Sequence, residues 1–249
     1  MNICLFEKSQ IDLPLSFDDE RGAHILNVLH KKQGDDFTAG IIGGQSGVAT
    51  ITRIDETARQ IFFEFKPTGD GKPLNPLKMI IGFPRPIQLK RLLRDIAALG
   101  ISEVHLTGTE LGEKSYMQSD LAQPEAAWKL LREGTVQAGS THVPEVFVHK
   151  SLEETLRFLS LSKGEHLICL DNVNPASPLG QVQFSADMPV VAAIGSERGW
   201  TDKERGLLEA AGFIRCGMGE RIMRTETAAT VAGAIILNAM GRLSGQARQ

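Results

Sequence analysis

Beyond Pro76 the chain alternates short apolar runs with longer amphipathic segments, and this alternation constrains the fold more than any other feature. The short runs predict strands at residues 78–82, 103–106, 167–170, 190–194 and 213–216. The longer segments predict helices at residues 87–99, 124–138, 152–159, 202–211 and 227–243. Strands that alternate with helices are typical of a mainly parallel sheet covered on both faces. We therefore expect an α/β domain here.

The first part of the chain has a different pattern. Short β-like runs at residues 3–6, 37–42, 48–54 and 61–65 are separated by turn signals, and residues 20–32 have helical spacing. Such runs predict a small barrel or sandwich. Residues 67–76 concentrate proline and glycine, which break regular structure, so we place a domain boundary there. The predicted domains are residues 1–72 and 73–249.

Charge restricts the function classes. A net charge of -3 over 249 residues argues against a protein coated in positive charge for non-specific nucleic-acid binding. A local basic patch remains open, because the segment from Lys78 to Arg94 contains no acidic residue. Its cations are Lys78, Arg85, Lys90, Arg91 and Arg94. The plainer interpretation of this segment is a solvated helix face.

Neither the cysteines nor the histidines suggest a metal site. Cys4, Cys169 and Cys216 lie in apolar neighbourhoods without zinc-ligand spacing, which predicts buried thiols in a reducing compartment. The N-terminus lacks the features of a signal peptide. The apolar stretch at residues 228–240 is shorter than the about 20 residues that span a bilayer. We expect a cytoplasmic protein with no metal and no membrane partner.

Two glycine-bearing loops, at residues 195–199 and 217–227, follow apolar runs. Glycine lets backbone approach a ligand closely, so two such loops could form one cleft, although a lone glycine after a strand is more often a turn. Ile222 stands where a dinucleotide fingerprint needs its third glycine, and there is no P-loop motif, so both of these nucleotide sites are disfavoured. The predicted helix that follows has many small residues and is apolar nearly all round. Such a helix is expected to be buried, either within the subunit or against another one.

The two loops also carry a resemblance. Residues 194–199 read Ile-Gly-Ser-Glu-Arg-Gly and match an Ile-Gly-Pro-Glu-Gly-Gly loop, while residues 218–228 match a Leu-Gly-x-Arg-Ile-Leu-Arg-x-Glu-Thr-Ala run. Further matches are His24, Val28, Leu29, Gly34, Asp35, the Leu99-Gly100 pair, Gln137 and Pro144. Through nearly its whole length the chain resembles the bacterial ribosomal-RNA uridine N3-methyltransferases, the RsmE-like members of the SPOUT methyltransferases.

The resemblance implies a fold, a cofactor and partners. It implies a PUA-like small β-barrel that binds RNA, followed by a SPOUT-type α/β domain with a C-terminal trefoil knot that holds S-adenosylmethionine. It further implies a homodimer through the knotted domain, methylating N3 of a uridine in 16S ribosomal RNA within the small subunit.

It also assigns residues. The expected cofactor-binding residues are Leu170, Ile194, Gly195, Gly199, Met218, Gly219, Ile222, Met223 and Thr225. A cation must meet the negative charge that develops as the uridine N3 proton leaves, and the candidates are Arg224 first and Arg221 second. Glu197 is a candidate proton acceptor. The expected RNA contacts of the β domain are Arg21, His24, Lys31 and Lys32. Further basic residues that could bind RNA, in compensation for departures from the family pattern, are Arg85, Lys90, Arg91 and Arg94.

The chain departs from the family pattern at Ser196, Arg198, His30, Asp95, Ala98, Leu111 and Ser140, mostly where the family carries RNA-facing charge. Three alternatives therefore remain open. They are a SPOUT enzyme acting on another RNA base or on ribose 2′-O, a non-catalytic RNA-binding assembly factor, and a generic nucleotide-binding α/β enzyme.

Overall fold

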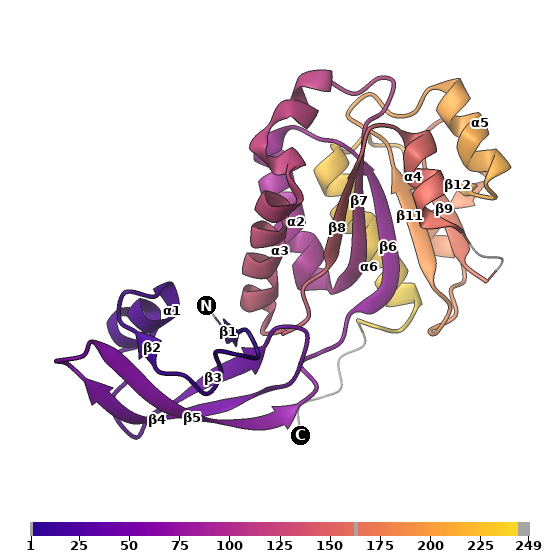
Figure 1. Ribbon diagram of the computed structural model, residues 1–249. Helices are drawn as coiled ribbons and strands as arrows, with labels where there is room; N and C mark the ends of the chain where they lie inside the picture. The colour runs from indigo at the N-terminus through magenta and orange to yellow at the C-terminus, as the bar shows by residue number, and fades with distance from the viewer. Residues whose placement is uncertain (1, 162–163, 244–249) are drawn as a thin grey trace. The chain divides into compact units, whose positions relative to one another are not determined.

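A computed structural model of the chain describes residues 2–161 and 164–243 (Figure 1). The chain forms two compact units. The first contains residues 1–73 together with 132–143, and the second contains residues 74–131 and 144–249. The functions that the resemblance assigns to the two parts stay predictions.

The first unit is built on one five-stranded sheet. Its strands are β1 (Cys4–Phe6), β2 (Leu15–Ser16), β3 (Asp36–Ile41), β4 (Ser46–Asp55) and β5 (Gln60–Gly69), in the order β1-β3-β4-β5-β2. The pairing of β1 with β3 is parallel and the other pairings are antiparallel. Because β1 and β2 are the two edges, the sheet curls without closing, and the predicted barrel is a half-barrel.

The helix predicted over residues 20–32 is shorter than expected. Asp19 caps α1 (Glu20–Ala23) by accepting a hydrogen bond from the Arg21 backbone N–H at 2.9 Å. The helix then widens into the π-helical turn η1 (His24–Val28). His30 has a left-handed backbone with φ of 52°, which ends the helical run.

The second unit is built on a seven-stranded sheet in which every pairing is parallel. Its order is β10-β12-β9-β11-β6-β7-β8. The strands are β6 (Asn75–Gly82), β7 (Ile101–Thr107), β8 (Glu145–His149), β9 (His166–Leu170), β10 (Ser177–Pro178), β11 (Val190–Ile194) and β12 (Ile214–Gly217). The predicted parallel α/β sheet is therefore confirmed, with β8 and β10 as edge strands that sequence patterning missed.

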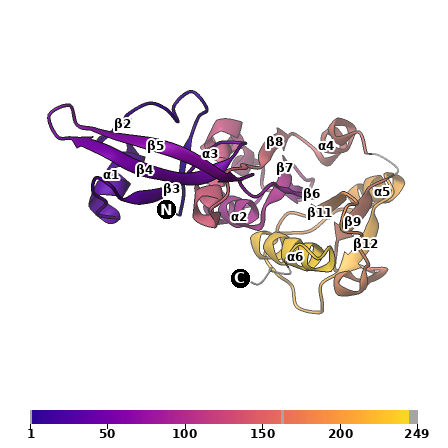
Figure 2. The same cartoon turned by 90° about the horizontal axis from the view of Figure 1, so that it is seen from below.

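Helices cover both faces of this sheet (Figure 2). On one face α2 (Pro86–Leu99) packs against α6 (Thr225–Ala239), and α6 contacts β6 and β11. On the other face, α4 (Leu152–Leu159) and α5 (Asp202–Ala210) close a core that contains Ile80, Val191 and Trp200. Neighbouring residues on one strand point to opposite faces, so Met79 instead lies against the α6 side, next to Gly233.

Four further helical segments lie in the described residues. They are η2 (Lys114–Gln118), η3 (Asp120–Ala122), α3 (Pro124–Ala138) and η4 (Leu179–Gln181). The capping-box spacing of Thr201 and Glu204 is confirmed at the start of α5, where each side chain accepts a hydrogen bond from the other residue's backbone. The trefoil knot implied by the resemblance stays a prediction.

Candidate active site

The carboxyl ends of three adjacent parallel strands meet at one edge of the second unit's sheet. Ile194 at the end of β11 pairs in register with Leu170 at the end of β9, and Leu170 pairs with Cys216 on β12. The chain leaves all three strands at this level. In open α/β sheets, ligands bind in the crevice outside the carboxyl ends of the strands.

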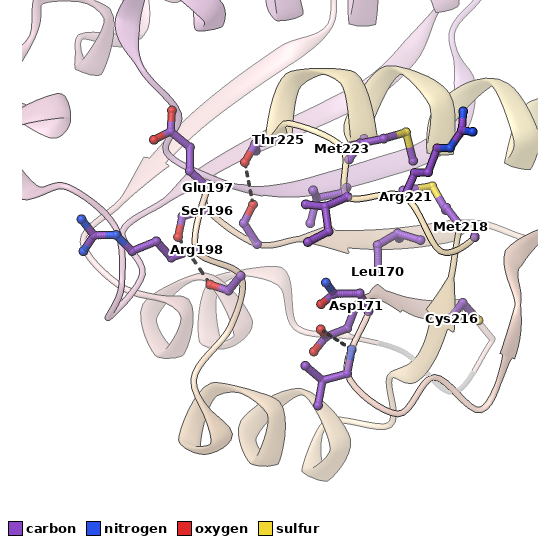
Figure 3. A pocket seen from close by; sticks show the side chains of 18 of the residues that line it. Leu170, Asp171, Ser196, Glu197, Arg198, Cys216, Met218, Arg221, Met223 and Thr225 are labelled. Atoms are coloured by element: carbon purple, nitrogen blue, oxygen red, sulfur yellow. Dashed lines mark hydrogen bonds between the residues drawn. The ribbon is translucent and has the colours of Figure 1, made fainter.

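A cavity of about 280 Å³ lies between the loops that follow these strands (Figure 3). Every residue predicted to bind the cofactor lines this cavity: Leu170, Ile194, Gly195, Gly199, Met218, Gly219, Ile222, Met223 and Thr225. Strand order explains how residues so distant in sequence meet, because β9 lies between β11 and β12.

The loop at residues 194–199 folds back on itself. The Gly199 N–H donates to the Ser196 carbonyl at 2.8 Å, and these two residues form an isolated antiparallel bridge. A Cβ at Gly195 would lie 2.9 Å from the Gly199 carbonyl carbon, a distance that real Cβ atoms essentially never show. Glycine at 195 is therefore required for the tight fold of this loop.

The loop at residues 218–225 is joined to the first one by a hydrogen bond. The buried Thr225 hydroxyl donates to the Gly195 carbonyl at 3.2 Å, which fixes the start of α6 against the first loop. Gly219 has a φ of 98°, a backbone conformation that other residues rarely adopt. The two glycine loops are thus in contact and line the same cavity.

An ion pair closes another side of the cavity. Arg205 on α5 places its Nε 2.6 Å from Oδ2 of Asp171, which immediately follows β9. Asp171 Oδ1 accepts a second hydrogen bond, from the Val173 backbone N–H at 3.0 Å. The hydrogen bond to Asp171 raises the pKa of Arg205. Both carboxylate oxygens are therefore engaged, and the ion pair ties the β9 loop to α5.

Three charged side chains of the two glycine loops point outward. Figure 3 shows the side chains of Glu197, Arg198 and Arg221 directed away from Leu170 and Asp171. All three residues nevertheless line the cavity. Arg224 does not: it is exposed and serves as the N-cap residue of α6. Of the two predicted arginines, the structure thus brings only Arg221 to the cavity rim.

The residues predicted to bind RNA fall into two groups. In the first unit, Arg21 is held by Asp19 at 2.7 Å and lies over the Phe6 ring, whereas Lys32 is exposed. His24 and Lys31 are half-buried. In the second unit Arg85, Lys90, Arg91 and Arg94 are exposed at the start of α2 and along it. The α2 cations thus form a row on one helix.

Sequence reasoning missed several lining residues of the cavity. They are Asp171, Asn172, Val173, Ser196, Arg198, Arg205, Cys216 and Ala228. Cys216 is one of three cysteines, all buried as predicted, and burial raises its pKa. Asp171 could have been predicted as a lining residue, because it directly follows the predicted strand at residues 167–170. The carboxyl ends of parallel strands meet at one edge of a sheet.

Two negative findings concern the described residues. Across residues 2–161 and 164–243, no group of three or more His, Cys, Asp or Glu side chains could hold a metal ion. None of the helices in those ranges combines the length and apolar character needed to cross a membrane.

The chain is similar to known proteins over most of its length. A family described as an RNA methyltransferase domain matches residues 71–237. The ribosomal RNA small subunit methyltransferase E of Treponema pallidum is 45% identical over 244 residues, which cover 95% of this chain and 91% of the relative. A protein named ribosomal RNA small subunit methyltransferase E 1, from Borreliella burgdorferi, is 31% identical, with 95% and 97% covered.

A solved structure shares the fold. It is a ribosomal RNA small subunit methyltransferase E from Neisseria gonorrhoeae, bound to S-adenosyl methionine. It superposes with a TM-score of 0.77 at 21% sequence identity, covering 96% of this chain and 97% of the other. The shared architecture extends over both units.

Proposed function

The chain belongs to the RNA methyltransferase family, together with ribosomal RNA small subunit methyltransferase E proteins, and we propose that it transfers a methyl group from S-adenosylmethionine to N3 of a uridine in 16S ribosomal RNA. One observation carries the proposal: the loops after β9, β11 and β12 form a single cavity lined by every residue expected to bind the cofactor.

The lining fits this cofactor. The cavity has a volume of about 280 Å³, which is close to the lower end of the range for ligand pockets, about 300 Å³. Leu170, Met218 and Met223 offer apolar surface to an adenosine moiety. The tight backbone at Gly195 and Gly219 offers N–H and C=O groups without intervening side chains. A relative of the same fold binds S-adenosyl methionine, which supports this assignment.

When bound, the cofactor supplies an activated methyl group on a sulfonium, so the protein has to orient the acceptor and exclude water. The Thr225–Gly195 hydrogen bond holds the two glycine loops at a fixed separation. The Asp171–Arg205 ion pair holds the third side. These contacts preorganise the cavity before any ligand enters.

The acceptor must lose its N3 proton, and the loop charges suit that task. Glu197 is our proposed proton acceptor, since its carboxylate is 40% exposed at the cavity rim. A guanidinium would stabilise the negative charge that develops on the uracil ring. Arg221 lines the rim, and Arg224 lies three residues further along the chain at the N-cap of α6, so both are retained as candidates for the cation.

The RNA has to present an extruded base, because N3 lies on the edge used in base pairing. We propose that the first unit holds the surrounding RNA through phosphate contacts, with Lys31 and Lys32 as its cations. Arg21 and His24 are the other proposed RNA contacts of this unit. On the second unit, Lys90, Arg91 and Arg94 along α2 would bind further phosphates, and Arg85 at the start of this helix is a further proposed RNA contact. The whole substrate is proposed to be the small ribosomal subunit.

A homodimer through the second unit completes the proposal. One face of α6 is buried within the subunit through Ala229, Ala232 and Ile236. Val231 and Ile235 are only half-buried, and Ile222 at the cavity is 84% exposed. Burying this apolar surface in a second copy would be favourable. We place the protein in the cytoplasm, where its RNA substrate is found.

Nucleoside mass spectrometry of small subunits tests the proposal. Subunits from a strain without the gene should lack one 3-methyluridine, and the purified protein with S-adenosylmethionine should restore it. Restoration of a different methylated base, or of a ribose-methylated nucleoside, would support the other SPOUT activities instead. Failure of the protein to bind S-adenosylmethionine would support an assembly factor.

A further inference from the structure

A second cavity borders the candidate active site. It measures about 180 Å³ and lies between the turn after β6 and the segment around residues 111–116. Its polar lining residues are Arg85, Glu113, Tyr116, Ser196, Glu197 and Arg198, and Phe83 contributes to its apolar part. The function proposed above gives roles to Arg85 and Glu197 but assigns no ligand to the cavity that they line.

One loop forms a wall of both cavities. Ser196, Glu197 and Arg198 line the candidate cofactor cavity and also line this second one. Figure 3 shows the Glu197 and Arg198 side chains directed away from the interior of the cofactor cavity. The backbone of the loop therefore faces one cavity while its charged side chains are available to the other.

Three side chains form a connected group in this second cavity. Arg85 Nε donates a hydrogen bond to the Tyr116 hydroxyl at 3.0 Å and lies 3.8 Å from Glu197 Oε1. Arg85 is 60% exposed and Glu197 is 40% exposed, so a ligand can reach both. Tyr116, the chain's single tyrosine, is half-buried on η2. An aromatic ring, a cation and a carboxylate thus surround one small space.

This set of groups matches the edge and face of uracil. Uracil presents one ring N–H between two carbonyl oxygens, and its π face stacks on aromatic side chains, as is common for single-stranded RNA bases. A guanidinium donates to a carbonyl oxygen, and a carboxylate accepts from the N–H. Cytosine carries an acceptor at the same ring position, which would face the carboxylate unfavourably.

We propose that this cavity receives the extruded acceptor uracil, with its ring stacked on Tyr116, a carbonyl facing Arg85 and its N3–H facing Glu197. The proposal rests on the methyl transfer proposed above. Because Glu197 lines both cavities, the N3 atom that faces it lies where the two cavities meet, on the side from which the methyl group comes. Tyr116 has a second role as a positioning residue, because its hydroxyl holds Arg85 near Glu197.

Kinetics of Tyr116 variants test the stacking. With saturating S-adenosylmethionine, Tyr116→Ala should raise the KM for unmethylated small subunits or lower the single-turnover rate by about ten-fold or more, the usual effect of losing one base–aromatic stack. Tyr116→Phe retains the ring and should lose a smaller factor. Gln118→Ala, an exposed neutral change on the same short helix, is the matched control and should equal the parent. Calorimetry should give one cofactor affinity for all four proteins.

Photocrosslinking tests the site without relying on turnover. Small subunits assembled with 4-thiouridine-containing 16S RNA should crosslink to the peptide that contains Tyr116. Parent-like rates for Tyr116→Ala, or crosslinks confined to other peptides, would overturn the base site while leaving methyl transfer intact. Crosslinking at Tyr116 by a protein that transfers no methyl group would reject the proposed reaction and retain the base site.

Discussion

Arg205 on α5 and Asp171 at the end of β9 form a hydrogen-bonded ion pair at 2.6 Å that borders the candidate cofactor cavity. The Asp171 side chain is 2% exposed and that of Arg205 is 14% exposed, so water screens this pair little. A buried pair of this kind determines geometry more than net stability, because desolvation offsets much of the attraction. Removing one partner is nevertheless costly.

Arg205→Ala should therefore lower the free energy of unfolding by roughly 3 kcal/mol, since it leaves the Asp171 carboxylate buried without its cation. Denaturant unfolding measures this change. Glu209→Gln is the control: it breaks the Arg215–Glu209 pair, whose members are 25% and 50% exposed, and should change stability by less than about 1 kcal/mol. Equal effects of the two substitutions would contradict the structural role of the buried pair.

Gly195→Ala should weaken S-adenosylmethionine binding on the order of ten-fold, because the added Cβ would lie 2.9 Å from Gly199 backbone and displace the loop. Gly206→Ala provides the control. That residue is exposed within α5 and a Cβ there meets nothing within 4 Å, so the change should stabilise the protein by about 0.5–1 kcal/mol. Undiminished cofactor affinity in Gly195→Ala would show that the loop is not part of the site.

Arg221→Ala and Arg224→Ala separate the two candidate cations. Each variant should keep its cofactor affinity within a few fold, and the one that removes the catalytic cation should lose about 100-fold in turnover. Transfer of a tritiated methyl group to undermethylated small subunits measures this loss. Arg157→Ala, an exposed change on α4, is the control. If both variants turn over at the parental rate, neither arginine stabilises the acceptor.

Stability should fall on acidification because of a buried histidine pair. His105 Nδ1 lies 3.0 Å from His149 Nε2, and burial lowers the pKa of His105 to about 4. In the unfolded chain its pKa is about 6.5, so between these values the unfolded state binds the extra proton. The unfolding free energy should therefore decrease from pH 6.5 down to about 4, by up to about 3 kcal/mol from this residue.

Urea unfolding at several pH values between 6.5 and about 4 shows whether the unfolding free energy falls on acidification. In the variant His105→Gln the unfolding free energy should depend less steeply on pH than in the parent, since the substitution removes this titrating group. The carboxylates and the remaining histidines still contribute. A parent that becomes more stable as the pH falls would contradict a buried neutral His105.

Local patterning predicted those parts of the molecule that depend on single segments. The strands β6, β7, β9 and β11 and the helix α4 form where their apolar spacing indicates. The two glycine loops could be predicted to meet, because parallel strands deliver their carboxyl ends to the same edge. One loop follows β11 and the other follows β12, and both of these strands lie next to β9.

Other features depend on contacts that spacing does not encode. The partnership of Asp171 with Arg205 requires α5 to pack beside the end of β9. Tyr116 meets Arg85 only once η2 folds over the start of α2. The edge strand β8 has only three consecutive apolar residues, flanked by Glu145 and His149, and a run this short was missed in a search for apolar segments.

Calorimetric titration with S-adenosylmethionine shows whether the loops after β9, β11 and β12 form the methyl-donor site. We expect saturable binding by the parent protein, unchanged binding by Gly206→Ala and strongly weakened binding by Gly195→Ala. No heat of binding with the parent protein, or equal affinity in both glycine variants, would contradict this assignment of the site.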